Sequence, residues 1–226
     1  MKKLRMRSAD PVATCTSDRT DGAVGHVQIK RQIIVNLARP LAQPAFVYTF
    51  TGLTDGEQHL AIRLGELSAS SRPLVRVHSE CLLGDVFGSR RCDCGPQLDE
   101  AVERVEAAGG WLLYLRQEGR GIGLYNKLEA YALQDSGLNT FEANEHLGFP
   151  ADGRDYRAAA EMLMALNVPS IDLLTNNPEK IGQLQAYGID IGEVHPTGTF
   201  TNDTNTRYLR AKAEHACHTL IFEGAQ

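Results

Sequence analysis

The chain has 226 residues, enough for one large domain or two small ones with a substantial core. Its hydrophobic content of 42% and charged content of 23% are those of an ordinary soluble globular protein. A net charge of −5 disfavours non-specific binding to nucleic acid, and no apolar run is long enough to span a membrane. The N-terminus lacks the apolar core of a secretory signal, so we expect a cytoplasmic protein.

The N-terminal part of the chain is predicted to be an extension followed by β-structure. Residues 1–25 are polar and show no sustained periodicity, so we expect a loosely ordered extension before a single domain at residues 26–226. Apolar and turn-forming residues then alternate in a way that predicts several strands. These strands are expected at residues 27–37, 45–50, 59–65 and 74–79. We expect this front part to be mostly antiparallel and meandering.

From residue 97 onward, helical periodicity alternates with short apolar runs. Helices are predicted at residues 98–108, 124–135, 156–166, 178–187 and 208–222. Buried strands are predicted at residues 111–115, 171–175 and 189–196, and residues 138–155 have the composition of a polar loop. This alternation predicts an α/β fold with a mixed sheet flanked by helices.

The cysteines divide into a cluster and two isolated positions: Cys81, Cys92 and Cys94, then Cys15 and Cys217. A cluster of three within fourteen residues indicates metal binding or catalysis more than disulfide formation in a reducing compartment. Three thiolates suit zinc and leave a fourth position for water, whose pKa the metal lowers to about 7. Two alternatives remain: a structural zinc with His78 or a remote residue as fourth ligand, and three thiols without metal. The isolated pair is interpreted as an incidental thiol and a packed side chain.

Two strand–turn–helix segments have features of anion-binding loops. QEGRGIGL is a glycine-rich turn that matches neither the P-loop nor the dinucleotide-binding pattern, but Arg116 and Arg120 suit phosphate. LLTNNPEK places Thr175 and Lys180 around a second turn. A thiolate metal site beside two such loops favours a hydrolase of a phosphorylated substrate.

Three further residues have plain structural interpretations. Asp152 and Arg154 in DGRDYR are typical of a solvated ion-pair segment that caps the next helix. Tyr131 shares a helix face with Leu124 and Leu128, which indicates core packing.

Four segments carry a resemblance to a known family: RVHSECLLGDVFGSRRCDCGPQL, YLRQEGRGIGLYNKLEAYALQD, NTFEANEHLGFPADGRDY and LLTNNPEK. In order and spacing they resemble GTP cyclohydrolase II, from about Ala45 to the C-terminus. The resemblance implies zinc- and magnesium-dependent conversion of GTP to 2,5-diamino-6-(5-phosphoribosylamino)pyrimidin-4-one, with release of formate and pyrophosphate. This reaction is the committed step toward riboflavin. The resemblance also implies a homodimer.

The resemblance further implies roles for individual residues. The zinc ligands are Cys81, Cys92 and Cys94. The GTP pocket is formed by Arg76, Val77, His78, Ser79, Glu80, Gln97, Glu118, Gly119, Arg120, Thr140, Thr175 and Lys180. In catalysis, Asp152 is the proton acceptor, Arg154 the nucleophile, and Tyr131 completes hydrolysis of the imidazole ring. Glu118 and Glu80 are candidates for reading the guanine edge.

Several alternatives stay open at this point. Because arginine keeps its proton at neutral pH, either Asp152 takes a proton from Arg154 during attack, or Arg154 stabilises charge while water attacks. The enzyme could stop at a formamidopyrimidine or at GMP, or the chain could be a zinc-containing guanine-nucleotide sensor without turnover. The acidic charge disfavours a nucleic-acid-binding zinc module. The sequence leaves open whether the product serves flavin synthesis or another natural product.

Overall fold

The computed structural model describes residues 26–37, 41–68, 72–150, 152–206 and 209. The expected N-terminal extension, Cys15, Cys217 and the expected terminal helix, apart from Leu209, lie outside the described residues. Within the described part of the chain, no helix has the length and apolar character needed to cross a membrane.

A single mixed sheet forms the centre of the described chain. Its seven strands lie in the order β1-β2-β3-β5-β4-β6-β7. Their bounds are β1 Gln28–Val35, β2 Ala45–Thr51, β3 Leu60–Leu64, β4 Leu74–Ser79, β5 Gly110–Leu115, β6 Ser170–Leu174 and β7 Asp190–His195. The pairs from β1 through β3 to β5 are antiparallel, and the pairs from β5 through β4 and β6 to β7 are parallel. The expected α/β fold with a mixed sheet and an antiparallel N-terminal part is confirmed.

The helices occupy most of the segments that periodicity predicted. They are α1 Leu82–Asp85, α2 Cys94–Ala108, the 3₁₀ turn η1 Glu118–Gly121, α3 Leu124–Asp135, α4 Thr140–His146, α5 Arg157–Ala165 and α6 Pro178–Ala186. Helix α6 begins as its sequence indicates, because Asn177 caps it with a side-chain bond from Glu179 N–H and Pro178 occupies its first turn. Helix α2 begins earlier than its apolar periodicity does, so Cys94 lies in its first turn.

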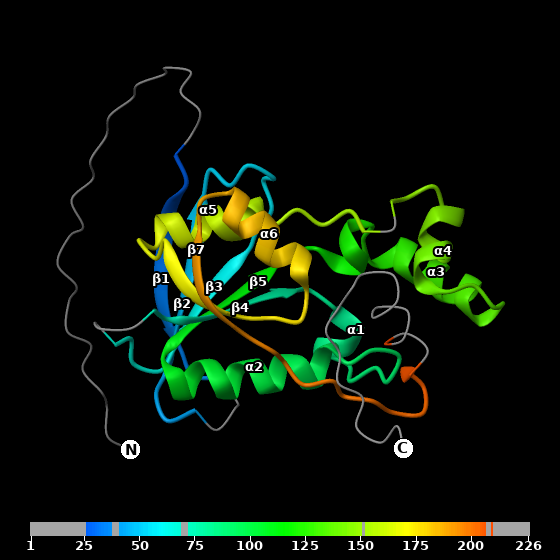
Figure 1. Ribbon diagram of the computed structural model, residues 1–226, viewed down its shortest axis with the longest axis horizontal. Helices are drawn as coiled ribbons and strands as arrows, with labels where there is room; N and C mark the ends of the chain where they lie inside the picture. The colour runs from blue at the N-terminus through cyan, green and yellow to red at the C-terminus, as the bar shows by residue number, and fades with distance from the viewer. Residues whose placement is uncertain (1–25, 38–40, 69–71, 151, 207–208, 210–226) are drawn as a thin grey trace, which may run out of the picture.

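Helices cover both faces of the sheet, with α2 on one face and α5 and α6 on the other (Figure 1). The alternation of side chains along β4 assigns its residues to these two faces. Val75 and Val77 join the core cluster that contains α5 and α6, whereas Leu74 joins the cluster that contains α2. Arg76 and His78 therefore face the α2 side, where the cysteines also lie.

The fourth predicted strand is where the antiparallel part of the sheet ends. Strand β4 pairs in parallel with β5 on one side and β6 on the other. Its residues from Leu74 to His78 are all buried, as is typical of a central parallel strand covered on both faces. Because β4 runs parallel to β5 and β6, its carboxyl end lies at the same edge of the sheet as theirs.

The expectation of a loop throughout residues 138–155 is also wrong, because α4 occupies Thr140–His146. Asn139 and Glu142 form a reciprocal cap before this helix. The Glu142 N–H donates to Asn139 Oδ1 at 3.0 Å, and the Asn139 N–H donates to Glu142 Oε2 at 2.7 Å. This is a capping box with asparagine in the first position, a signal that the polar composition of the segment obscures.

Candidate active site

The functional segments meet at the carboxyl edge of the parallel strands, where α/β proteins commonly bind ligands. Strands β4, β5 and β6 end there, and each leads directly into one of the predicted motifs. A cleft with an empty volume of about 1080 Å³, part of it open to solvent, lies at this edge. The tertiary structure thus brings the cysteine cluster and both predicted anion loops to one place.

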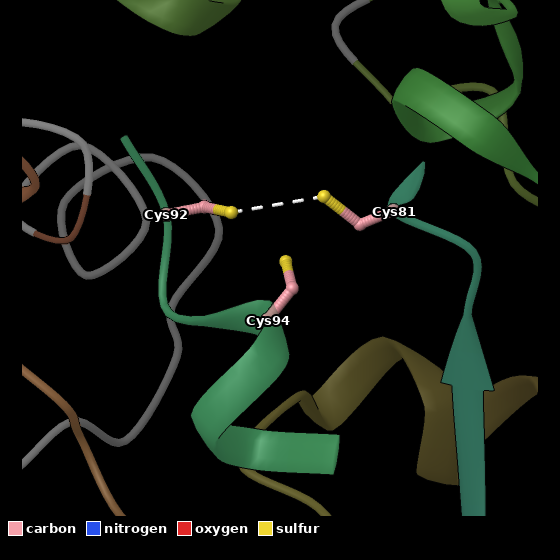
Figure 2. A group of neighbouring side chains, drawn as sticks. All are labelled: Cys81, Cys92 and Cys94. Atoms are coloured by element: carbon pink, nitrogen blue, oxygen red, sulfur yellow. Dashed lines mark hydrogen bonds between the residues drawn. The ribbon is translucent and has the colours of Figure 1, made fainter. Parts of the chain in front are cut away.

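The three cysteine sulfurs point toward one another (Figure 2). Cys81 precedes α1 and Cys94 opens α2, and the three Sγ atoms all lie within 4.8 Å of one another. The Sγ atoms of Cys81 and Cys92 are 3.7 Å apart. Two sulfurs bound to one tetrahedral zinc at about 2.3 Å each lie about 3.8 Å apart, so the donor set and its spacing fit zinc.

Gly84 gives the sulfurs their space. A Cβ atom at this position would lie 2.8 Å from the Cys92 Sγ and 3.0 Å from the Cys81 Sγ. Any larger residue in α1 would therefore push against the sulfurs and spread the cluster. This requirement explains the glycine in a helix, where glycine is otherwise unfavourable.

Asp85 fixes the backbone at Cys81 and also holds His78. Its carboxylate accepts from the Cys81 N–H at 3.0 Å, from the Tyr114 hydroxyl at 2.8 Å, and pairs with His78 Nε2 at 3.1 Å. Burial lowers the pKa of His78, against the opposing effect of Asp85. His78 thus faces Asp85, and the cluster of potential ligands found among the described residues contains the three cysteines without it. These contacts disfavour the alternative in which His78 completes a structural zinc site.

Lys127 on α3 links the cysteines to the glycine turn. Its Nζ atom donates to Cys81 Sγ at 3.1 Å and to Glu118 Oε1 at 2.6 Å. Hydrogen bonds from Cys92 and Cys94 hold the pKa of Cys81 far below its ordinary value, and Lys127 adds to this effect. Burial alone would lower the pKa of Lys127, but Cys81 and Glu118 together raise it. The first turn of α3 therefore carries a cation directly against the thiol cluster.

The glycine turn has an unusual backbone. Gly119, Arg120 and Gly121 all have positive φ angles, of 64°, 64° and 91°. Arg120 is the informative member, since residues with a Cβ atom rarely adopt the left-handed region. Its carbonyl oxygen accepts from the Gly153 N–H at 3.1 Å, which ties the turn to the segment that carries Asp152 and Arg154. Strain of this kind is commonly found at functional sites.

Asp152 and Arg154 form the expected ion pair, but it is not a solvated one. Their side chains are only 16% and 15% exposed, and Arg154 lines the cleft. Arg154 Nε donates to Asp152 Oδ1 at 2.8 Å, and its Nη2 pairs with Oδ2. Burial would raise the pKa of Asp152, but the bonds and charge of Arg154, with the charge of Arg120, hold this pKa below its ordinary value.

The second anion loop and the end of β4 hold two buried cations. Lys180 Nζ donates to the Val77 carbonyl oxygen at 2.7 Å. Arg76 donates to the Leu174 carbonyl oxygen at 3.1 Å and to Gln97 Oε1 at 3.0 Å. In all, five cationic side chains and two carboxylates line the cleft: Arg76, Arg120, Lys127, Arg154 and Lys180, with Glu80 and Glu118. The cleft is thus a local basic pocket in an acidic chain, which suits an anionic ligand.

Most of the predicted site residues line this one cleft. They are Arg76, His78, Ser79, Glu80, Cys81, Cys92, Cys94, Gln97, Glu118, Gly119, Arg120, Tyr131, Arg154, Thr175 and Lys180. Val77 lies in the core and reaches the site through its carbonyl oxygen, and Asp152 reaches it through Arg154. Thr140 opens α4, but its side chain lies outside what the structure describes.

Two interpretations of site residues change. Tyr131 is not a core residue: it is half-buried and lines the cleft, and the Arg91 guanidinium lies 4.5 Å from its ring centre. Ala130 is instead the buried residue of α3. Both Glu118 carboxylate oxygens already accept from the chain, Oε2 from the Leu82 N–H at 2.7 Å and Oε1 from Lys127.

Sequence reasoning missed several cleft residues. They are Gln117, Ile122, Lys127, Ala130, Gln134, Asn144, Asn176, Asn177 and Thr197. Lys127 had one usable signal, because it lies a single turn after the glycine-rich segment, on a helix that this segment opens. Thr197 had none, since it is held at the cleft by long-range bonds, from its backbone to the Asn176 amide and from its hydroxyl to Glu100.

The fold and the site together define an α/β protein in which a thiolate metal site adjoins a cationic cleft. Comparison with known proteins agrees and is more specific. The family model of GTP cyclohydrolase II matches residues 32–196. The chain is 50% identical over 196 residues to GTP cyclohydrolase-2 of Psychromonas ingrahamii, covering 86% of this chain and 98% of that protein.

Two other relatives show the same pattern. GTP cyclohydrolase-2 of Aliivibrio fischeri is 54% identical over 181 residues, which is 80% of this chain and 90% of that protein. The riboflavin biosynthesis protein RibBA of Bacillus mycoides is 54% identical over 172 residues, 76% of this chain but only 43% of that protein. The chain belongs to the GTP cyclohydrolase II family. It is an enzyme with that family's activity, the hydrolysis of GTP in the first step toward riboflavin.

The space at Gly84 gives a first testable prediction. We expect Gly84→Ala to spread the sulfurs and to reduce zinc affinity about tenfold or more, measured by competition with a chelator. Gly182→Ala is the control, because a Cβ atom there meets nothing within 4 Å. Equal zinc affinity in Gly84→Ala and the parent protein would show that the glycine does not shape the site.

The Asp152–Arg154 pair gives a pH-dependent prediction. Because the folded pKa of Asp152 lies below the ordinary value of 3.8, its carboxylate stabilises the fold above that value, and this stability is lost as pH falls through the lower folded pKa. We expect Asp152→Asn to lose about 1 to 3 kcal/mol of unfolding free energy at pH 7. Urea unfolding should show the difference from the parent shrinking below pH 4. A constant difference at every pH would contradict the assignment.

Proposed function

We propose that this chain carries out the complete cyclohydrolase reaction, in which the imidazole ring of GTP is opened and formate and pyrophosphate are released. The observation that carries the proposal is the meeting of three buried thiols, a cationic cleft and the Asp152–Arg154 pair at one edge of the sheet. An arrested enzyme would need only part of this set, and a zinc-containing nucleotide sensor would not need the Asp152–Arg154 pair.

Cys81, Cys92 and Cys94 are the proposed zinc ligands. When bound by these residues, zinc would supply a water-derived nucleophile at neutral pH for attack on C8 of guanine. The residues around the cluster hold the sulfurs in place: Asp85 bonds the Cys81 backbone and Gly84 leaves room for the sulfurs. Tyr131 lines the same cleft, and its proposed role is to complete hydrolysis of the opened ring.

The triphosphate is the proposed ligand of the cationic loops. Arg120 and Lys180 come from the two anion loops, and Thr175 and Gly119 line the cleft beside them. Charge-assisted hydrogen bonds from such groups neutralise a developing pyrophosphate. Magnesium is proposed to enter with the triphosphate, as the family resemblance implies. Thr140 is kept as a proposed contact on the same ground.

Asp152 and Arg154 are proposed to act as a unit at the α-phosphorus. Asp152 holds Arg154 through Nε and Nη2, and the lowered pKa of Asp152 reflects a carboxylate paired with a protonated guanidinium. These contacts favour the account in which Arg154 stabilises charge while water attacks, over the account in which Arg154 is itself the nucleophile. Asp152 then serves to orient Arg154 and to accept the proton that the attacking water loses.

The guanine base is proposed to lie near the end of β4. Glu80 lines the cleft and uses Oε2 to accept from Arg116 Nε at 2.8 Å, so its carboxylate is already oriented. Since both oxygens of Glu118 are engaged by the chain, Glu80 is the better candidate for the guanine edge. Arg76, Val77, His78, Ser79 and Gln97 complete the proposed pocket.

The proposal also covers domain organisation, oligomeric state and location in the cell. One continuous sheet from Gln28 to His195 supports a single catalytic domain over residues 26–226. A homodimer follows from the resemblance and is supported by the exposed isoleucines of edge strand β1, Ile33 and Ile34. A cytoplasmic location is proposed because closely spaced free thiols persist in reducing compartments.

The test of the whole proposal is a product assay on purified protein with GTP, magnesium and a matched zinc determination. Formate, pyrophosphate and the diaminopyrimidine should form in equal amounts. Pyrophosphate without formate at full zinc occupancy would instead identify an enzyme that does not open the ring. GTP binding with no product would identify a sensor.

Replacement of one proposed zinc ligand tests the metal. We expect Cys92→Ser to lose zinc and ring opening together, because serine is a poor ligand for zinc in a thiolate site. Zinc is measured by elemental analysis and ring opening by formate release. Full activity in the zinc-free variant would rule out a catalytic metal.

Replacement of the proposed ring-hydrolysis residue tests Tyr131. We expect Tyr131→Phe to keep zinc and GTP binding but to accumulate a formamide intermediate, because only the hydroxyl is removed. Mass spectrometry of a time course would show the intermediate. Tyr125→Phe is a suitable control, since Tyr125 is 82% exposed on the same helix. A product distribution equal to that of the parent would remove the role assigned to Tyr131.

A further inference from the structure

Lys127 is a buried cation of the cleft to which neither the sequence motifs nor the reaction assigns a role. Its Nζ atom donates to Cys81 Sγ at 3.1 Å and to Glu118 Oε1 at 2.6 Å. The side chain is 11% exposed and that of Glu118 is 9% exposed. A lysine placed this deeply beside a sulfur needs a compensating interaction, and the thiol cluster provides one.

The neighbouring segments leave space for Lys127 and hold its second partner, Glu118. A Cβ atom at Gly119 would lie 3.1 Å from the Lys127 Cβ, so the glycine turn leaves space for the stem of Lys127. Glu118, the second partner of Lys127, accepts from the Leu82 N–H at 2.7 Å with its other oxygen. Leu82 directly follows Cys81. Lys127 thus joins α3, the glycine turn and the start of α1 at the sulfur of Cys81.

The contact between Lys127 and the Cys81 sulfur changes the charge and the electron donation of the thiolate cluster. Three thiolates around a divalent metal would leave one net negative charge, and the Lys127 ammonium, which Glu118 also contacts, offsets part of it. A hydrogen bond to a thiolate also draws electron density away from the sulfur, so the sulfur donates less to the metal. Partners of this kind orient metal ligands and tune the metal.

We propose that Lys127 is a positioning residue of the zinc site, which acts through Cys81 by holding its sulfur and weakening its donation to the metal. The inference rests on the proposed zinc site. It concerns Lys127 in particular, because two neighbouring cations are directed elsewhere. Lys180 donates to the Val77 carbonyl oxygen, and Arg154 pairs with Asp152.

The experiment compares variants of the full chain by two measurements that do not depend on turnover. Lys127→Met removes the charge and the donor, Lys127→Arg retains both, and Lys180→Met removes a buried cleft lysine that bonds a carbonyl oxygen instead. Zinc affinity is measured by competition with a chelator. The strength of sulfur donation is measured from the charge-transfer absorption of the cobalt-substituted protein.

We expect Lys127→Met to bind zinc about 10- to 100-fold more weakly than the parent protein, because losing the nearby positive charge and the hold on the Cys81 sulfur outweighs the stronger donation of the freed sulfur. Its cobalt charge-transfer band should move to longer wavelength, because a thiolate without the hydrogen bond is easier to oxidise. Lys127→Arg should restore affinity and band position toward those of the parent. Lys180→Met should leave both unchanged.

A double variant separates the effect on Cys81 from the effect on Glu118, which Lys127→Met leaves without a cationic partner. Lys127→Met with Glu118→Gln removes that carboxylate charge, and the proposal expects zinc affinity to stay low. Recovery of affinity in the double variant would overturn it. If Lys127→Met fails to fold in thermal unfolding, Lys127→Gln takes its place in the comparison.

Two further outcomes would overturn the Lys127 proposal, and a third would overturn the metal site on which it rests. Parent-like zinc affinity and cobalt absorption in Lys127→Met would overturn the role of Lys127. An equal loss in Lys127→Met and Lys180→Met would overturn it as well, since the effect would belong to any buried cation of the cleft. If the parent protein itself binds no zinc through its cysteines, the proposed metal site fails, and this result is distinct from a failure of the Lys127 proposal.

Discussion

The parallel pairing of β4 between β5 and β6 is the constraint on which the site depends. Because parallel strands end at the same edge of a sheet, this pairing places Cys81, the glycine turn after β5 and Thr175 within reach of one another. An antiparallel β4 would send Cys81 to the opposite edge. The pairing also buries β4 on both faces, so Arg76 and His78 enter the site with their side chains already held.

The second organising feature is charge compensation inside a buried cleft. Three carboxylates that are buried or nearly so meet a basic partner: Asp85 meets His78, Glu118 meets Lys127, and Asp152 meets Arg154. Unpaired, such groups would be strongly destabilising. In the first two pairs the partners lie on different elements, so these contacts also fix the relative positions of β4 and α1, and of α3 and the glycine turn. Preorganised charge of this kind is what a reaction with an anionic leaving group requires.

Much of this could be read from the sequence, because the signals are local. Helical periodicity located α3 and α5 closely, the Asn-Pro pair located the start of α6, and the spacing of Cys81, Cys92 and Cys94 identified the donor set. Prediction from these local signals failed where two patterns in the same segment pointed to different structures. The polar composition of residues 138–155 concealed α4, although Asn139 and Glu142 were a legible cap. Tyr131 was expected to pack in the core with Leu124 and Leu128, yet it lines the cleft, and Leu128 is exposed.

The sequence by itself determined the elements, the metal-binding chemistry and the family, since each is set by residue type and spacing along the chain. Only the tertiary structure decided how they combine. The direction of β4 depends on pairing between segments that are far apart in sequence, which no local pattern records. The same is true of Lys127 against Cys81, which lie 46 residues apart and meet only after α3 packs beside the cysteines. Contacts across such separations depend on the assembled fold, so they could not be predicted from the sequence.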